Sequence, residues 1–178
     1  MFDIDQFIAD CVAARADGII AVKEVLDRAL ARSDDVAQAL PATVAEFAPL
    51  YTSPDVSIFK FVWGPSMSVP PHNHLMWAIN GIYGGAEDNV FYRRSESGIV
   101  ESGGRRVERA ESAVLGADVI HAVTNPNSRA CTGSIHIYGG DYLRQPRSIW
   151  DADSHEERPA DGDTIRRIFE EARDQQPA

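Results

Sequence analysis

The stretch Val69-Pro-Pro-His72-Asn-His74-Leu-Met-Trp77 places two histidines two residues apart. Side chains at positions i and i+2 of a β-strand point to the same face, so His72 and His74 can direct two imidazoles toward one ion. A third histidine, His121, follows in the stretch Gly116-Ala-Asp-Val-Ile-His121-Ala-Val-Thr-Asn125 and can complete the set. Histidines grouped at ligand spacing are candidates for metal binding, so the three together predict a metal site.

Each of these histidines taken alone would more simply be a strand residue whose ring nitrogens are satisfied by hydrogen bonds. The metal interpretation is favoured because His72 and His74 form a pair and His121 follows later in the chain. The fifth histidine of the chain, His155, lies in the acidic run Asp151-Ala-Asp-Ser-His-Glu-Glu157 and is expected to be solvated.

Length and charge limit what can surround such a site. The chain has 178 residues, which predicts a single domain over 1–178 with room for one sizeable core. Its 27 acidic and 17 basic side chains give a formal net charge of −10. A surplus of negative charge repels phosphate backbones and anionic lipid surfaces, so the sequence predicts neither a nucleic-acid partner nor a membrane partner.

The beginning of the chain, Met1–Gln6, lacks the basic start and apolar core of a secretory signal, and no apolar run reaches the length of a membrane span. We therefore expect a cytoplasmic protein, a monomer or a homodimer. The two cysteines, Cys11 and Cys131, show no Cys-x-x-Cys spacing and are expected to be small buried apolar residues.

Hydrophobic periodicity predicts a helical lead over residues 1–48, because apolar residues recur there at helical spacing. Asp17-Gly18 interrupts the lead. Pro41 is expected to open a further short helix over Thr43–Phe47, since proline is tolerated in a first turn.

From 50 to 142 the pattern changes to short β-rich runs separated by turn residues, which predicts an antiparallel sandwich or barrel. The clearest of these runs are Val56–Trp63, Asn89–Arg93 and Gly133–Tyr138. From 143 to 178 we expect a polar loop followed by a C-terminal helix over Thr164–Arg173 that packs an apolar stripe on the barrel.

The run Ser134-Ile-His-Ile-Tyr138 carries a second group of polar residues. Strict alternation puts Ser134, His136 and Tyr138 on one face of a strand. In the simpler interpretation the polar face meets water, as in many half-exposed strands. Alternatively, the two isoleucines pack on the helical lead outside the barrel and the polar face lines a cavity, where Tyr138 could reach over the metal with His136 orienting it and Ser134 orienting His136.

Together these motifs resemble the cupins, and among them the iron-dependent thiol dioxygenases typified by cysteine dioxygenase. The stretches Gly64–His74 and Gly116–Asn125 are similar to the two cupin motifs, and Ser134-x-His136-x-Tyr138 is similar to a Ser-His-Tyr relay. Trp77 and the stretch Gly81–Glu87 resemble the bacterial branch. The resemblance covers roughly residues 50 to 142 and implies a double-stranded β-helix, or jelly-roll, barrel with flanking helices.

By this resemblance, His72, His74 and His121 would bind Fe(II) and leave positions for a thiolate and dioxygen, while Tyr138, His136 and Ser134 would serve catalysis. Other divalent metals, such as Ni, Mn or Zn, remain open. The expected reaction adds O2 to the sulfur of a small thiol, such as cysteine or mercaptopropionate, to form a sulfinate.

The sequence departs from related patterns at several points. Many cupins supply a glutamate four or five residues after the second histidine, but Ala78 and Ile79 stand there, and the nearest acid, Glu87, is expected to be structural or to act behind the ligands. No arginine follows Tyr51, where animal cysteine dioxygenases hold a substrate carboxylate. The cysteine that those enzymes link to their tyrosine also has no counterpart near Trp77.

A substrate carboxylate could instead meet Arg93, Arg94 or Arg144, although each is more simply a surface residue. Trp63 and Trp77 could line an apolar pocket beside the metal, although packing is the simpler expectation for Trp63. Met67 and Met76 flank the histidine pair and are expected to fill the core rather than to act as sulfur ligands. Two other functions stay open: another metal-dependent cupin reaction, such as oxidative carbon–carbon cleavage or isomerisation, and a non-catalytic barrel that senses a ligand. Hydrolysis through Ser134 is disfavoured because no Gly-x-Ser-x-Gly pattern is present.

Overall fold

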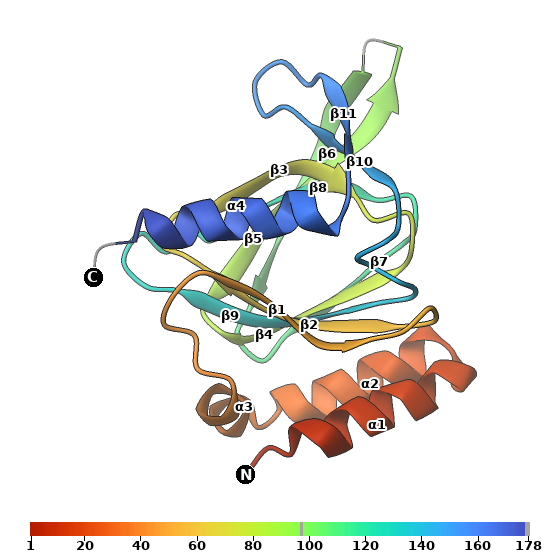
Figure 1. Ribbon diagram of the computed structural model, residues 1–178, viewed down its shortest axis with the longest axis vertical. Coiled ribbons are helices and arrows are strands. Elements are labelled where there is room, and N and C mark those ends of the chain that lie inside the picture. Colours follow the sequence, from red (N-terminus) through yellow and green to blue (C-terminus); the bar gives the residue numbers. More distant parts are fainter. Residues whose placement is uncertain (97, 177–178) are drawn as a thin grey trace.

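Two antiparallel sheets face each other in the computed structural model, which describes residues 1–96 and 98–176 (Figure 1). One sheet has five strands, in the order β1-β2-β9-β4-β7, and the other has six, in the order β11-β10-β3-β8-β5-β6. The strands of the five-stranded sheet are β1 (Glu46–Thr52), β2 (Ser57–Trp63), β9 (Thr132–Tyr138), β4 (Ala78–Gly84) and β7 (Ser112–Leu115). Those of the six-stranded sheet are β11 (Glu157–Ala160), β10 (Arg147–Trp150), β3 (Ser68–Asn73), β8 (Ile120–Thr124), β5 (Ala86–Ser95) and β6 (Gly98–Glu108).

Strands that follow one another in sequence repeatedly cross from one sheet to the other, so the chain winds as a double-stranded β-helix around an interior space. The expected fold class, an all-β jelly-roll core with helices at both ends, is confirmed. Among the described residues, no helix is both long and apolar enough to cross a membrane.

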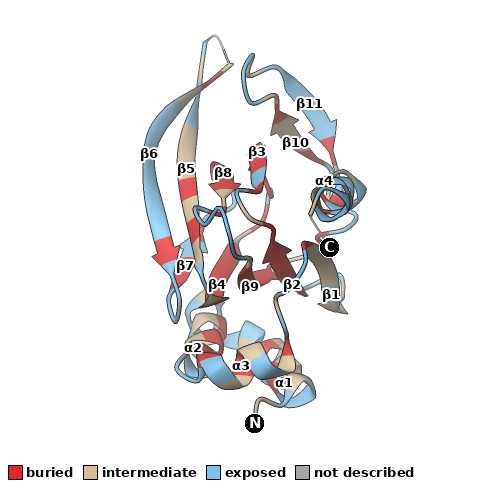
Figure 2. Ribbon diagram, turned by 90° about the vertical axis from the view of Figure 1, so that its left-hand side faces the viewer, coloured by how far each residue is buried: buried red, intermediate tan, exposed pale blue. Residues whose placement is uncertain are grey.

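The N-terminal helices cover the outer face of the five-stranded sheet (Figure 2). They are α1 (Ile4–Ala14), capped by Asp3, then α2 (Ile19–Leu30) and α3 (Ser33–Ala39), with a 3₁₀ turn at Arg15–Asp17 after α1. Gly18 ends that turn with φ of +97°, a conformation that favours glycine, which explains the predicted break in the helical lead.

Helix α2 approaches the sheet closely. Leu26 and Leu30 are fully buried and pack with Ile135 and Ile137 of β9. Gly81 of β4 lies beneath them, and a Cβ atom added to it would come within 2.6 Å of a Leu26 methyl carbon. A glycine at this position therefore permits the tight contact between helix and sheet.

The C-terminal helix α4 (Gly162–Asp174) lies across the edge of the barrel, between β1 and β11 (Figures 1 and 2). Asp161 begins it with a capping box to Thr164, in which each side chain bonds the backbone N–H of the other residue. Its buried face carries Ile165 and Phe169, and the Phe169 ring lies 5.0 Å from the Trp63 ring. The predicted apolar stripe thus packs on the barrel.

Two boundaries differ from the sequence-based expectation. The predicted helix over Thr43–Phe47 is not formed, and the strand β1 begins at Glu46. Phe47 pairs with Phe61 across the β1–β2 ladder and stacks on Phe59 at 4.9 Å, so tertiary packing outweighs the local helix signal. The polar segment after residue 142 likewise contains β10 and β11, which extend the six-stranded sheet beyond the predicted core.

Leu26→Ala should destabilise the protein by about 2–5 kcal/mol, because it opens a cavity between α2 and β9. Urea unfolding followed by circular dichroism would measure the loss. Ile20→Ala is the matched control, since Ile20 lies on the same helix with 59% of its surface exposed and should change the stability by less than about 0.5 kcal/mol. Equal effects of the two substitutions would contradict the described packing.

Candidate metal centre

The two strands β3 and β8 bring three histidines together inside the barrel. His72 and His121 face each other directly in the β3–β8 ladder, and His74 follows the end of β3. Their ring centroids are 4.6 Å apart for His72 and His121, 5.1 Å for His72 and His74, and 5.0 Å for His74 and His121. All three side chains are buried.

Hydrogen bonds fix how two of the rings are turned. Nδ1 of His72 lies 2.9 Å from the carbonyl oxygen of Pro70, and Nδ1 of His121 lies 2.9 Å from Oδ1 of Asn89. Both oxygens only accept, so in each ring Nδ1 carries the proton and donates it. In each neutral ring Nε2 therefore keeps a free lone pair, and Nε2 of His121 lies 3.4 Å from Nε2 of His74.

The cluster fits a metal ion. Burial lowers the pKa of His72 to about 4, and burial together with the neighbouring histidines lowers the pKa values of His74 and His121 well below their ordinary value. Three neutral imidazoles, with one ligand atom each within 4.8 Å of the others, can coordinate a cation. Nitrogens bound at about 2.1 Å to one ion are separated by roughly 3.0–3.4 Å, which agrees with the His74–His121 distance.

Strand β9 places a tyrosine beside this cluster. All seven residues of β9 are buried, so the half-exposed alternative does not hold, and Ile135 and Ile137 pack outward on the helices. The Tyr138 ring lies 5.0 Å from the His74 ring, and the Tyr138 hydroxyl is 3.2 Å from Nδ1 of His136. The expected contact between His136 and Tyr138 is therefore present.

The expected contact between Ser134 and His136 is replaced by others. Oγ of Ser134 accepts a hydrogen bond of 3.1 Å from Nε1 of Trp63. The second ring nitrogen of His136, Nε2, instead lies 3.0 Å from Oε1 of Glu87. Both nitrogens of His136 are thus engaged without Ser134. Sequence alone could not reveal this exchange, because Glu87 lies 49 residues before His136.

The structure adds two residues that the sequence did not single out. Tyr142 packs on Tyr138 with a ring distance of 4.0 Å, and the guanidinium of Arg147 lies 3.9 Å from the centre of the Tyr142 ring. Arg147 is 4% exposed and donates to the Tyr142 carbonyl oxygen at 2.6 Å. Its Nε and Nη2 atoms are buried without a hydrogen-bond partner among the described residues. The short β-favouring run Ser148-Ile-Trp150 was the available sign that Arg147 begins a strand.

Arg147 is also close enough to shift the pKa values of the histidines and tyrosines of the site. Its positive charge is one of the causes, after burial, that lower the pKa values of His72 and His74. On Tyr138 and Tyr142, where burial raises the pKa most, Arg147 acts in the opposite direction. An unpaired buried cation is costly, so its free N–H groups are a ready site for an anion.

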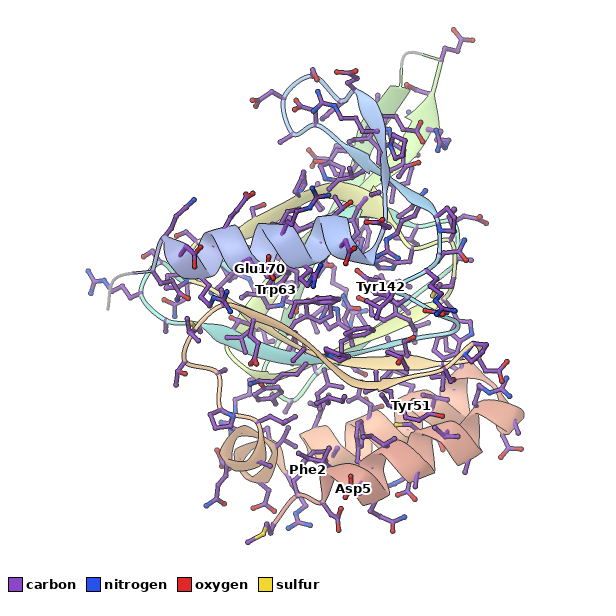
Figure 3. All side chains as sticks on the ribbon, viewed as in Figure 1. Phe2, Asp5, Tyr51, Trp63, Tyr142 and Glu170 are labelled. Carbon is purple, nitrogen blue, oxygen red and sulfur yellow. The ribbon has the colours of Figure 1, made fainter. Side chains whose placement is uncertain are left out.

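The residues around the histidines enclose a cavity of about 10 Å³, the space of roughly one water molecule. Trp63 and Tyr142 lie between α4 and the five-stranded sheet (Figure 3). The lining consists of Phe61, Trp63, Val69, His72, His74, His121, Val123, His136, Tyr138, Tyr142 and Ile165. Met67 and Met76 belong to the surrounding apolar core, as expected for core residues.

The other candidate residues lie away from this cavity. Arg94 makes a two-pronged ion pair with Glu157, with both N–O distances at 2.9 Å, and Arg93 and Arg144 are exposed. His155 is half-buried against the Tyr92 ring, 5.7 Å away, so it is less solvated than expected.

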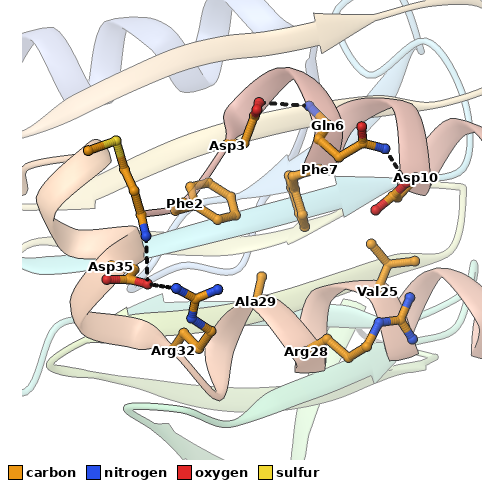
Figure 4. A pocket seen from close by; sticks show the side chains of 11 residues that line it. Phe2, Asp3, Gln6, Phe7, Asp10, Val25, Arg28, Ala29, Arg32 and Asp35 are labelled. Carbon is orange, nitrogen blue, oxygen red and sulfur yellow. Dashed lines mark hydrogen bonds and ion pairs between the residues drawn. The ribbon is translucent and has the colours of Figure 1, made fainter.

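A separate hollow lies between the N-terminal helices, on the far side of the five-stranded sheet (Figure 4). Phe7 and Val25 are among its apolar residues. Asp35 pairs there with both Arg32 and the N-terminal amino group. These charges satisfy one another at the surface, and the hollow contains none of the histidines.

Comparison with known proteins supports the fold. No model of a known protein family matches the chain. A Bacillus halodurans protein shares the fold with 11% identity and a TM-score of 0.51, over 60% of this chain and 78% of its own. An RmlC-like cupin with a double-stranded β-helix from Methanocaldococcus jannaschii has 13% identity and a TM-score of 0.48, over 57% of this chain and 85% of its own. A cupin superfamily protein from Desulfitobacterium hafniense has 17% identity and a TM-score of 0.47, over 60% and 88%. At identities this low only the Bacillus halodurans match, with its TM-score above 0.5, bears on the fold, and it bears on nothing else.

The fold is a double-stranded β-helix barrel. Its interior holds a buried three-histidine cluster that could bind a metal ion.

The purified protein should bind one divalent metal ion per chain, and His121→Ala should abolish binding because it removes one of three ligands. Asn89→Leu should weaken the affinity roughly 10- to 100-fold, since Asn89 orients the His121 ring. Titration calorimetry of metal-free protein would measure both effects. His155→Gln is the control and should leave the affinity unchanged; undiminished binding by the His121 variant would contradict the site.

Proposed function

We propose that this protein is a mononuclear non-haem iron(II) dioxygenase that oxidises a small thiol bearing a carboxylate, such as cysteine or mercaptopropionate, to the sulfinate. The observation that carries the proposal is the position of Tyr138, whose ring packs on His74 beside the three-histidine cluster while its hydroxyl contacts His136. A tyrosine turned away from the cluster would have favoured another cupin reaction.

The reaction is R–SH + O2 → R–SO2H, in which both oxygen atoms join sulfur and sulfur gives up four electrons to dioxygen. Iron(II), when bound, supplies the redox chemistry that allows dioxygen to react with a thiolate. His72, His74 and His121 would hold it. Three neutral imidazoles add no negative charge to the site, so the full charge of a divalent ion stays available to favour the thiolate over the thiol.

The remaining residues of the chain would bind and orient the substrate. Burial raises the pKa of Tyr138 well above its ordinary value, so its hydroxyl stays protonated and would lie beside the reacting groups as a neutral hydrogen-bonding group. Arg147 would bind the substrate carboxylate through Nε and Nη2, the two nitrogens without a partner among the described residues. The apolar rings of Phe61 and Trp63 would exclude water around the sulfur.

A second candidate is a non-catalytic barrel in which the metal is structural and a small ligand is sensed. The cavity of about 10 Å³ favours it, because structural metal sites are closed whereas catalytic sites keep a position for substrate. A thiol substrate is larger than this cavity, so catalysis requires the surrounding side chains to move apart when the substrate enters.

Protein reconstituted anaerobically with Fe(II) should consume oxygen when a carboxylate-bearing thiol is added, and should form one sulfinate per O2. An oxygen electrode with product analysis would measure the ratio across a panel of small thiols. His121→Ala is the control and should show no thiol-dependent uptake. If iron-loaded wild-type protein consumes no oxygen with any thiol of the panel, the sensing function becomes the better assignment.

Arg147→Gln should raise KM for mercaptopropionate roughly 10- to 100-fold, because it removes charged hydrogen bonds to the carboxylate. The KM for cysteamine, which has no carboxylate, should change little. Arg144→Gln is a matched control, since the Arg144 side chain is 90% exposed and lies three residues earlier. Equal losses for the two substrates would show that Arg147 serves the structure of the site and not the carboxylate.

A further inference from the structure

Glu87 is the one acidic side chain among the described residues that is buried in the barrel, with no exposed surface. A buried carboxylate is costly unless it is paired, so its retention inside the fold calls for a partner that uses its charge or its oxygen atoms. Its Oε1 atom lies 3.0 Å from Nε2 of His136, and Oε2 has no hydrogen-bond partner among the described residues.

The contact determines which nitrogen of His136 carries the proton. A carboxylate can only accept, so Nε2 of His136 must donate to Glu87. In the neutral ring, Nδ1 is then an acceptor, and it lies 3.2 Å from the Tyr138 hydroxyl. Because Tyr138 is buried and keeps its proton, its hydroxyl needs an acceptor. The neighbouring Tyr142 hydroxyl is one candidate, and Nδ1 of His136 becomes a second when the proton of that ring is on Nε2.

We propose that Glu87 is a positioning residue, which holds His136 as the Nε2–H tautomer and thereby sets the direction of the Tyr138 hydroxyl. Its effect on catalysis rests on the thiol dioxygenase function proposed above. Its effect on the tautomer of His136 does not depend on which reaction takes place at this site.

Strand β5 carries residues that contact two different parts of the site. Glu87 and Asn89 are two apart on β5, so their side chains point to the same inner face. Asn89 bonds His121 of the candidate ligand set, whereas Glu87 bonds His136 next to Tyr138. Substitution of each residue should therefore disturb a different part of the site.

The test is nuclear magnetic resonance of the imidazole nitrogens in metal-free protein labelled with ¹⁵N-histidine, with His136→Gln used to assign the signals of His136. Wild-type protein should show His136 as the neutral Nε2–H tautomer. Glu87→Gln retains an oxygen acceptor and should keep that tautomer. In Glu87→Leu an Nε2–H would be buried without an acceptor, so the proton should move to Nδ1 and be donated to the Tyr138 oxygen.

Any other protonation state of His136 in the wild-type protein would overturn the proposal, as would an unchanged Nε2–H tautomer in Glu87→Leu. If Glu87→Leu does not fold, Glu87→Met takes its place, and the wild-type spectrum remains decisive by itself. Asn89→Leu is the matched control: it should weaken metal binding and leave the His136 tautomer as it is, whereas Glu87→Leu should change the tautomer and leave the metal affinity within about threefold.

With iron-loaded protein, Glu87→Leu should lower kcat about tenfold or more with little change in KM, and Glu87→Gln should restore most of it. A matching loss in both variants would contradict a role through the tautomer. Failure of the proposed function would appear differently, as no thiol-dependent oxygen uptake by the wild-type protein, and the spectra of metal-free protein would still decide the role of Glu87.

Discussion

Three imidazole rings that lie close together inside a barrel must all be neutral. To bind one cation, each ring must also direct a nitrogen with a free lone pair toward the centre of the cluster. Two protonated rings a few ångströms apart in a dry interior would repel each other strongly. The fold meets this constraint in two ways. His72 and His121 are paired across the β3–β8 ladder. Nδ1 of His72 donates to the Pro70 carbonyl oxygen and Nδ1 of His121 donates to Oδ1 of Asn89. Lone pairs then converge where a cation can satisfy them.

The five-stranded sheet contributes residues to the same cavity from the side opposite the histidine cluster. Strand β9 is buried on both faces because it separates two environments, with Ile135 and Ile137 against the helices and His136 and Tyr138 toward the cavity. The helical layer therefore allows β9 to present polar side chains inward, since the apolar side of the strand is covered from outside. Without that layer, alternation would place the isoleucines in the core.

The sequence was sufficient for those features that depend on regular spacing. The His-x-His pair, the later His121 and the alternation of β9 predicted a barrel with a histidine cluster, because strand geometry converts sequence spacing into a shared face. The helical lead and the C-terminal helix followed from periodicity in the same way. The expected short helix at Thr43–Phe47 failed because the ring of Phe47 packs among aromatic residues distant in sequence.

Contacts that arise only from long-range packing could not be read in advance. Glu87 and Arg147 enter the site from strands that lie 49 residues before and 11 residues after His136 in the numbering of the chain. Arg147 looked unremarkable in a polar segment, and Glu87 was expected only to be structural or to act behind the ligands, with no indication of its contact with His136. What distinguishes them is burial with unpaired polar atoms, a property of the folded chain alone.

The place of α4 bears on how the chain can be shortened. Ile165 is part of the cavity wall, and Phe169 rests on Trp63, although both lie beyond every polar residue of the site. A protein ending at residue 160 would keep all three histidines, both tyrosines and Arg147, yet one side of the cavity beside them would be open to water. The C-terminal segment thus sets the dielectric surroundings of the centre without contributing a single polar group to it.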